Sequence, residues 1–495
     1  MNLKTLRNVV FWSFGVLYLI LAPLISLHAL GFVFEPKAFA FVKTGILSID
    51  SHPKGASVTL NGNLFSDKTP LAISRLRAGK YRVQVNLPDY QTWNRELSVQ
   101  PEEVTRAEHI LLVPQKLKIE IPFSFPIQHL VPSNEGKFLF LISKEEKTVN
   151  IYAFDLKKER LFRVMSHTEA KHRKTLLVSL TSSDDDRRLL ACFDGRPGPE
   201  YVIAALSETA GPISLPLISG KPISNVRFHP RDSQELFYLN AGELARFNLN
   251  NQSKKEIILK DVRSFEIIQD KIYYFTNDFR LFSSGLDGRE NIDLLPERGL
   301  RRLLFGEEEK HVYQMFFTAK ENAFWLRQDG TFLMNRLPYF ADENVRGAKL
   351  AADSERLLYW KSNELWILDL SPVEARRNGF FEEGPAKNLL WQSDRPIVSA
   401  EILRGEDHVM AATDKMILII EATEAPSKNS FVICAHKAGQ KISFYFDDDS
   451  GKLYWTDRGK DGRATLHISK LFEPIPYPFT IRFRKPYHSP DKIVL

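Results

Sequence analysis

The hydrophobic pattern of the first 34 residues differs from that of the rest of the chain. From Val9 to Phe34 the sequence carries no acidic or basic side chain except His28. As a helix this stretch would reach about 39 Å at about 1.5 Å per residue, and a hydrocarbon core is about 30 Å thick. The pattern predicts a short tail (1–8), a transmembrane helix (9–34) and a linker (35–44).

A cleaved signal peptide is the alternative for this segment. Lys4 and Arg7 would form its basic amino-terminal region, and Ala38-Phe39-Ala40 would supply a small-residue cleavage site. A signal peptide has an apolar region of about 7 to 15 residues, and this one is much longer. We therefore expect an uncleaved single-pass anchor.

The charges beside the predicted helix are nearly balanced, with Lys4 and Arg7 before it and Lys37 and Lys43 after it. The short leading tail has no acidic residue and carries the terminal amine. This predicts a cytoplasmic amino terminus, with the bulk of the chain outside the cytoplasm.

Between residues 45 and 114 the apolar residues alternate with polar ones, which predicts short strands. Pro53-Lys54-Gly55, Asn61-Gly62 and Ala78-Gly79 mark the reversals between them, and Asn-Gly is typical of tight hairpins. The alternating apolar positions are Leu47, Ile49, Val58, Leu60, Tyr81, Val83, Val85, Leu87, Leu97 and Val99. A β domain of about 70 residues built from a pair of sheets is expected.

The residues in and around these turns resemble the PEGA family of small bacterial β domains. Lys54 replaces the family's glutamate, and Asp89 stands where the family usually has glycine. The resemblance implies a non-catalytic domain of the cell envelope. The matching segments are 53–56 (PKGA), 58–62 (VTLNG), 69–71 (TPL), 78–83 (AGKYRV) and 88–90 (PDY).

Beyond residue 115, pairs of apolar strands joined by short polar turns recur about every 45 residues on average. The eight pairs begin at residues 137, 188, 235, 271, 323, 356, 408 and 452. This period is typical of a β-propeller, and several pairs follow a further strand-like stretch, such as 223–230 or 397–402. We expect an all-β chain with a propeller over 115–485, of eight blades or alternatively seven, and a tail (486–495). Residues 117–121 or 480–484 could supply the strand that closes the ring.

Two segments resemble known propeller families. Residues 225–230 (NVRFHP) with the pair at 235 are similar to TolB-like blades, and residues 451–457 (GKLYWTD) are similar to the YWTD repeat of lipoprotein-receptor propellers. Each resemblance covers one blade, so it implies architecture and no ligand.

Composition agrees with a folded β protein, with 43% apolar residues, 35 Phe and 15 Tyr. The net charge of +6 is small for 495 residues, and basic residues alternate with acids, so no nucleic-acid partner is expected. Cys192 and Cys434 lie in apolar runs of different predicted blades, and we expect two buried, unbonded thiols.

Candidate chemistry is sparse. The hydrolase elbow, the zincin helix and the P-loop motif do not occur in the sequence. His167 and His172 share a charged loop, and His229 precedes a proline; a solvated loop and a strand end are the expected roles. The runs Asp184-Asp185-Asp186 and Asp447-Asp448-Asp449 could offer oxygen ligands to calcium, but each directly precedes a strand and is expected to form a polar turn.

Two further turns carry fragments of known motifs. Residues 457–462 contain acids at EF-hand-like positions, but Gly459 replaces a ligand and Ile468 stands where the bidentate glutamate belongs. Residues 329–332 hold part of a sialidase-type Asp-box. Both are expected to be hairpin turns, and no catalytic, cofactor-binding or metal-binding residue is assigned.

These observations predict a membrane-anchored binding or scaffold protein of the bacterial envelope, with a protein or glycan partner recognised by propeller loops. The alternative is a propeller hydrolase or lyase acting on envelope glycans or peptides, which needs two acids in a cleft. If the charges beside the helix do not set its orientation in this way, the alternative is a scaffold that faces the cytoplasm.

Overall fold

The chain divides into two compact units, each described by itself. The first comprises residues 1–117 with two short later segments, 425–433 and 471–475; the second comprises the remainder. The structure, a computed structural model, describes residues 3–29, 31–36, 39–168, 176–194, 198–207, 211–215, 223–278, 280–294, 312–317, 323–327, 329–334, 340–351, 355–377, 380–403, 407–422, 428–436, 442–458 and 463–473.

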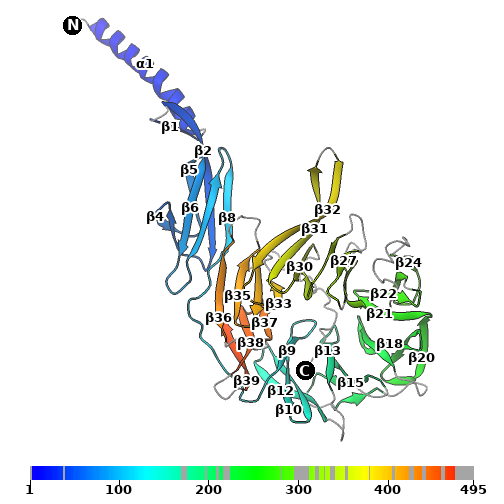
Figure 1. The fold of residues 1–495 in the computed structure, drawn as a ribbon. Coiled ribbons are helices and arrows are strands. Elements are labelled where there is room, and N and C mark those ends of the chain that lie inside the picture. Colours follow the sequence, from blue (N-terminus) through cyan, green and yellow to red (C-terminus); the bar gives the residue numbers. More distant parts are fainter. Residues whose placement is uncertain are drawn as a thin grey trace. The chain divides into compact units, whose positions relative to one another are not determined.

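The first unit begins with the predicted apolar helix, but the helix ends earlier than expected. Helix α1 spans Leu3–Ala29, and β1 (Phe32–Glu35) pairs antiparallel with β2 (Ala40–His52). Gly31 adopts a φ of +81°, which favours glycine, and its N–H donates to the carbonyl of His28 at 3.2 Å. The helix expected over 9–34 and the linker expected over 35–44 are therefore corrected to a helix followed by a β hairpin (Figure 1).

Residues 40–111 form two sheets that enclose a small core. Leu47, Ile49, Val58 and Val85 are fully buried, as the alternation predicts, and so is Trp93, which the pattern did not single out. The predicted positions Tyr81, Leu87 and Leu97 are partly buried. The first sheet has the order β1-β2-β5 with β8 parallel to β2, and the second has the order β4-β3-β6-β7. The remaining strands are β3 (Ser57–Leu60), β4 (Asn63–Lys68), β5 (Leu71–Arg77), β6 (Gly79–Asn86), β7 (Trp93–Val99) and β8 (Val104–Leu111).

The turns of this domain adopt the predicted conformations. Asn61 and Gly62 have φ angles of +49° and +87°, as a tight hairpin turn requires. Asp89 has a φ of +68°, so an aspartate holds the left-handed conformation at this position. The sequence pattern missed β4, β5 and β8, whose apolar residues alternate less regularly.

Beyond residue 117 the described residues form seven four-stranded sheets and one three-stranded sheet, each antiparallel and in chain order, running around a ring (Figure 1). The first sheet consists of β9 (His129–Pro132), β10 (Phe138–Glu145), β11 (Thr148–Asp155) and β12 (Arg160–Thr168), and the second of β13 (Leu177–Ser182), β14 (Arg188–Phe193), β15 (Glu200–Ala205) and β16 (Ile213–Ser214). The third sheet consists of β17 (Ser224–His229), β18 (Asp232–Asn240), β19 (Glu243–Asn248) and β20 (Asn251–Leu259), and the fourth of β21 (Val262–Ile268), β22 (Lys271–Thr276), β23 (Leu281–Gly285) and β24 (Ile292–Asp293).

The next four complete the series. The fifth sheet consists of β25 (Val312–Phe317), β26 (Ala323–Arg327), β27 (Phe332–Met334) and β28 (Ala341–Asp342), and the sixth of β29 (Gly347–Leu350), β30 (Arg356–Trp360), β31 (Glu364–Arg377) and β32 (Phe380–Gln392). The seventh sheet consists of β33 (Ile397–Ile402), β34 (His408–Thr413), β35 (Met416–Glu421) and β36 (Ser430–Ala435), and the eighth of β37 (Phe444–Asp447), β38 (Lys452–Arg458) and β39 (Ala464–Lys470).

All eight strand pairs predicted from the sequence are antiparallel hairpins. Seven lie at the centre of their four-stranded sheets, and in the eighth, β38 and β39, the second strand is the outer one of a three-stranded sheet. Their strands are buried along most of their length; in β10 the six residues from Phe138 to Ser143 are all buried. Packing on both faces explains why these strands are almost continuously apolar and stand out in the sequence. The strands expected at 223–230 and 397–402 are β17 and β33.

The first and last sheets are joined, so the ring is closed. Glu120 and Ile468 exchange two backbone hydrogen bonds of 2.9 Å, which place residue 120 beside β39. The same core cluster contains Leu139 of the first sheet and Tyr454 of the last. One predicted closing segment, 117–121, is thus confirmed at Glu120; the other, 480–484, and the tail (486–495) lie outside the described residues.

Both cysteines are free, as predicted. Cys192 is buried in β14 of the second sheet, and Cys434 is half-buried in β36 of the seventh.

Candidate functional site

Polar turns gather at one end of the ring, where the first strand of a sheet turns into its second. We call residues 133–137, 183–187, 230–231 and 269–270 the turn face; they belong to the first four sheets. Gly136, Asp186 and Gln269 adopt φ angles of +71°, +50° and +56° within these turns. The tight reversals bring backbone and short polar side chains to this end of the ring.

The aspartate run of the second turn binds the sheets on either side of it. Buried Asp186 accepts hydrogen bonds from the hydroxyls of Ser133, on the first sheet, and Ser182, at 2.5 and 2.7 Å. Asp185 accepts from Ser233 of the third sheet at 2.9 Å, and Asp184 from the Asn134 amide at 3.2 Å. The run therefore links three successive sheets.

The hydrogen bonds that the Asp185 carboxylate accepts shift its pKa. Burial acts to raise the pKa, but hydrogen bonds from the Ser183 hydroxyl, the Arg187 N–H and the Ser233 hydroxyl outweigh it, and the pKa is lowered. Asp185 is thus held as an anion by its own neighbours.

Two ion pairs connect the third sheet to the fourth. Arg227 makes a bidentate ion pair with buried Glu266, with N–O distances of 2.7 and 2.9 Å. Arg231 pairs with Asp270 at 2.9 and 2.6 Å on the surface. Bidentate pairs of this kind fix orientation as well as charge.

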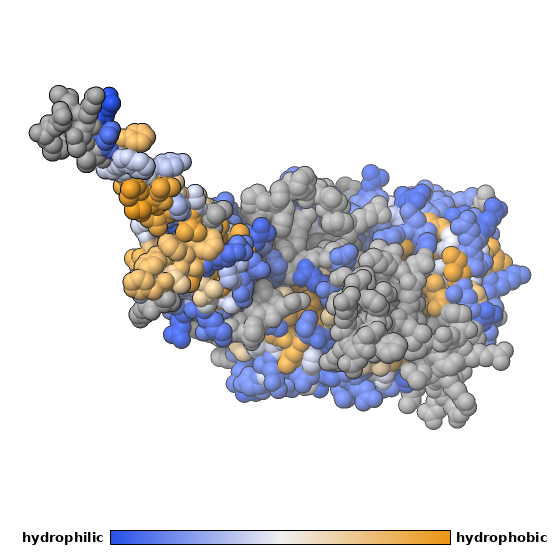
Figure 2. All heavy atoms as spheres, turned by 90° about the horizontal axis from the view of Figure 1, so that it is seen from above, coloured by the Kyte–Doolittle hydropathy of each residue, from blue (hydrophilic) through white to orange (hydrophobic). Residues whose placement is uncertain are grey.

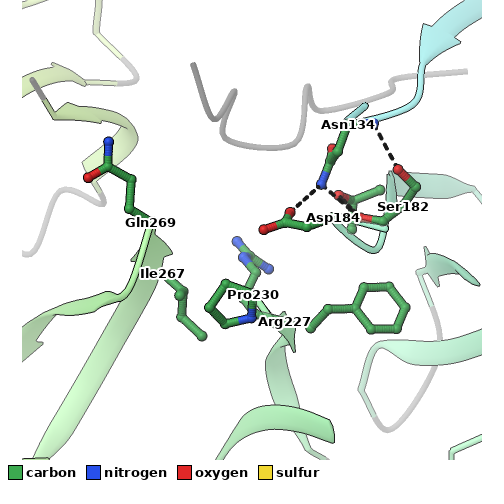
Figure 3. Close-up of a pocket in the computed structure, with 9 residues that line it drawn as sticks. Asn134, Ser182, Asp184, Arg227, Pro230, Ile267 and Gln269 are labelled. Carbon is green, nitrogen blue, oxygen red and sulfur yellow. Dashed lines mark hydrogen bonds between the residues drawn. The ribbon is translucent and has the colours of Figure 1, made fainter. Parts of the chain in front are cut away.

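A small hollow opens between these turns (Figure 3). Asn134 donates to the Ser182 carbonyl at 2.8 Å and to Asp184, Gln269 lies on the opposite side, and Arg227 lies between them. Its volume of about 30 Å³ holds about two water molecules and is too small for an organic substrate. A larger ligand would therefore have to contact the turn face from outside.

The other histidines and aspartates singled out in the sequence occupy structural positions. His229 stacks on Phe237 and accepts from the Arg231 N–H at 3.1 Å, and burial lowers its pKa. His167 was expected in a solvated loop, but it lies in β12, half-buried, and its ring stacks on that of Phe193 with 4.0 Å between the ring centroids. His172 lies outside the described residues.

The remaining aspartate turns also bond within themselves. Asp447 accepts from the Asp449 N–H and the Ser450 hydroxyl, and Asp329 accepts from the Thr331 N–H. Residues 459–462 of the EF-hand-like segment lie outside the described part of the chain. Within that part, three or more His, Cys, Asp or Glu side chains do not converge as a metal site would require.

One cluster with catalytic residue types escaped the sequence reasoning. Cys434 Sγ lies 3.5 Å from His436 Nε2, and His436 Nδ1 lies 3.2 Å from Asp457 Oδ2. The order thiol, imidazole, carboxylate is that of nucleophilic cysteine enzymes. Its sequence signal is a spacing of two residues in an extended segment, which places Cys434, on β36, and His436, just past the end of β36, on the same side.

This cluster does not activate its thiol. The His436 side chain is fully buried, and burial raises the pKa of Cys434 to about 12. A thiol with this pKa is protonated at neutral pH and is a weak nucleophile. The cluster links the seventh sheet to β38 of the eighth.

Comparison with known proteins agrees with the two parts of the chain. Residues 44–111 match the PEGA domain family. The match nearly coincides with the predicted range, 45–114, so the chain carries a PEGA domain. No curated protein sequence matches this chain.

Solved propeller structures are similar to a large part of this chain. The β-propeller domain of Cps50 (Swd1) from Myceliophteria thermophila is 13% identical with a TM-score of 0.41, covering 72% of this chain and 100% of its own. The Dos1 propeller is 11% identical with a TM-score of 0.47, covering 73% and 95%. These similarities concern the fold alone. The ring of antiparallel sheets described above makes the chain an all-β protein with a propeller. The TolB-like and YWTD-like types stay predictions from single segments.

Proposed function

We propose that this chain is a single-pass membrane protein of the bacterial cell envelope. Its amino terminus faces the cytoplasm, and the PEGA domain and an eight-bladed propeller serve outside as a binding or scaffold module. Residues Val10–Ala29 of α1 have a mean hydropathy of 2.1 and would span about 30 Å. Their large side chains are exposed, Phe11 by 72% and Leu19 by 71%, and form an apolar surface suited to lipid (Figure 2).

The pairing of β1 with β2 supports an uncleaved anchor. Ala40, the last residue of the small-residue motif of the signal-peptide alternative, pairs with Glu35 at the end of this hairpin. Cleavage there would remove β1 and leave the edge of β2 unpaired. The hairpin is therefore better suited to a chain that keeps its helix.

Recognition is favoured over catalysis by the occupation of the turn-face acids. Asp184, Asp185, Asp186 and Asp270 of the turn face bind residues of neighbouring turns or sheets, as does Glu266 of β21, whereas Glu135 of the turn face is exposed. The hydrolase or lyase alternative needs a pair of acids open to substrate, so we do not adopt it. This occupation carries the proposal that the turn face meets a protein or glycan partner through its exposed surface.

Site-specific photo-crosslinking in the membrane of a bacterial host tests the recognition surface. A photoreactive residue replaces exposed Gln269 on the turn face; the control position is exposed Lys147, in the turn at the opposite end of β10. We expect a discrete adduct from position 269 alone, lost when Arg187, whose side chain is 80% exposed, is changed to Glu. An adduct from position 147 alone, or an adduct at 269 insensitive to Arg187→Glu, would reject the turn face as the recognition surface.

A further inference from the structure

The hairpin after α1 exposes three aromatic side chains to solvent, one of them almost fully. Phe39 is 86% exposed, and Phe34 and Phe41 are each 41% exposed. The Phe34 ring lies 5.7 Å from that of Phe39 and 5.4 Å from that of Phe41, so the three rings form one group. We call Phe34, Phe39 and Phe41 the aromatic cluster.

The joint between helix and hairpin holds this cluster beside the end of α1. The Gly31 carbonyl accepts from the Thr44 N–H at 3.2 Å and from the Thr44 hydroxyl at 2.5 Å. Together with the bond from the Gly31 N–H to His28, these fix a reversal that brings β1 against α1. The exposed apolar side chains of the helix are thus followed by those of the hairpin (Figure 2).

We propose that the aromatic cluster is seated in the lipid interface of the bilayer that α1 spans, on the side where α1 ends. This proposal rests on the proposed membrane anchor, so the depth of the aromatic cluster in the bilayer follows from the position of α1. The apolar span Val10–Ala29 has about the length of the hydrocarbon core, so Ala29 lies at its boundary and residues 31–36 and 39–43 lie at headgroup level.

Charge and backbone chemistry fit this depth. Lys43 lies 5.7 Å over the Phe32 ring and pairs with Glu102 at 2.6 Å, so its charge stays on the polar side. Strand β1 is an edge strand of its sheet, and its free backbone groups need water, which the interface supplies and the hydrocarbon core does not. Phenylalanine side chains are suited to burial just below the headgroups.

Nitroxide depth measurement on the full chain tests this placement. Cys192 and Cys434 are changed to Ala, and single labels replace Phe39, Ile20 of α1 or Leu64 of the PEGA domain in vesicles of phosphatidylcholine and phosphatidylglycerol. Collisions with oxygen report lipid, and collisions with a water-soluble nickel chelate report solvent. We expect position 39 to have an oxygen-to-nickel ratio several-fold above that of position 64, which is 71% exposed, and below that of position 20.

Each other result overturns the proposal in a recognisable way. A lipid signal at 20 with a solvent signal at 39 keeps the anchor and rejects the seated cluster. Low access to both probes at 39 indicates cover by a second copy or another protein, and a solvent signal at 20 rejects the anchor itself. If the variant without cysteines loses the native circular dichroism spectrum, Phe39→Trp in the wild-type chain is measured by quenching with brominated lipids; no added quenching contradicts the proposal.

Discussion

The hydroxyl of Ser133 donates a 2.5 Å hydrogen bond to Asp186, a buried carboxylate on the neighbouring sheet. Asp186 also accepts from Ser182 and from the Lys137 N–H, and it holds a left-handed backbone conformation. One side chain thus fixes its own turn and ties it to the preceding sheet.

Changing Asp186 to Asn should destabilise the propeller. Asn tolerates the same φ, so the change tests the charged hydrogen bonds alone, and losing bonds to a buried charged group costs about 1–3 kcal/mol. Thermal unfolding in detergent should show a lowered midpoint. Asp184→Asn should have a much smaller effect, because the Asp184 side chain is half-buried and its hydrogen bond from Asn134 is longer. Equal effects of the two changes would contradict the role of Asp186 in tying its turn to the preceding sheet.

Asp342 should make stability depend on acid pH. Burial acts to raise its pKa, but hydrogen bonds from Lys361, Lys387 and Tyr359 lower the pKa to about 2. The ordinary value is about 3.9, so this carboxylate stabilises the folded state above about pH 4, and the contribution is lost as pH falls towards 2. The loss amounts to about 2 kcal/mol.

The Asp342→Asn variant isolates this contribution. Its unfolding free energy should be lower than wild type at neutral pH and should fall less steeply between about pH 4 and about pH 2. Asp287→Asn is the control, since that side chain is 58% exposed. Parallel pH profiles for wild type and Asp342→Asn would contradict the assignment.

Ring closure should depend on Ile127, which lies in the core shared by the first and last sheets. Its side chain is fully buried, and its N–H donates to the Ala464 carbonyl at 2.7 Å. Ile127→Ala should cost about 2–5 kcal/mol, with faster hydrogen exchange in β37 to β39. Ile119→Ala, at a 49% exposed side chain, should change stability by less than about 0.5 kcal/mol. Similar losses for both variants would argue against a shared closing core.

Both thiols should be unreactive in the folded chain. Burial raises the pKa of Cys192 to about 11 and that of Cys434 to about 12, so neither forms a thiolate near pH 8. A thiol reagent should label two cysteines after unfolding and react only slowly before it. Rapid labelling of Cys434 in the native chain would instead show an active thiol in its cluster with His436.

The sequence predicted the parts of the fold that burial controls. The central hairpins were visible because strands packed on both faces are continuously apolar, and Asn61-Gly62 was visible because its turn needs positive φ. The end of α1 was misplaced because the apolar run continues into β1, where Gly31 sets the boundary. Hydropathy cannot distinguish an apolar helix from an apolar hairpin that follows it.

The candidate site was less predictable for a topological reason. Asp186 binds Ser133, and His436 lies beside Asp457, only because neighbouring sheets bring distant turns together. A single sequence shows that a turn is polar but not which turns share an end of the ring. The interpretation of the aspartate run as a polar turn was therefore right about its local form and silent about its partners.

The topology of the full chain is the most direct test of the central claim, an anchored propeller outside the cytoplasm. A reporter that is active only outside the cytoplasm is fused after the last residue in a bacterial host, and membranes are then extracted with carbonate. We predict an active reporter on a full-length chain that stays in the membrane pellet. An inactive reporter, or a shortened chain released from the membrane, would contradict the account.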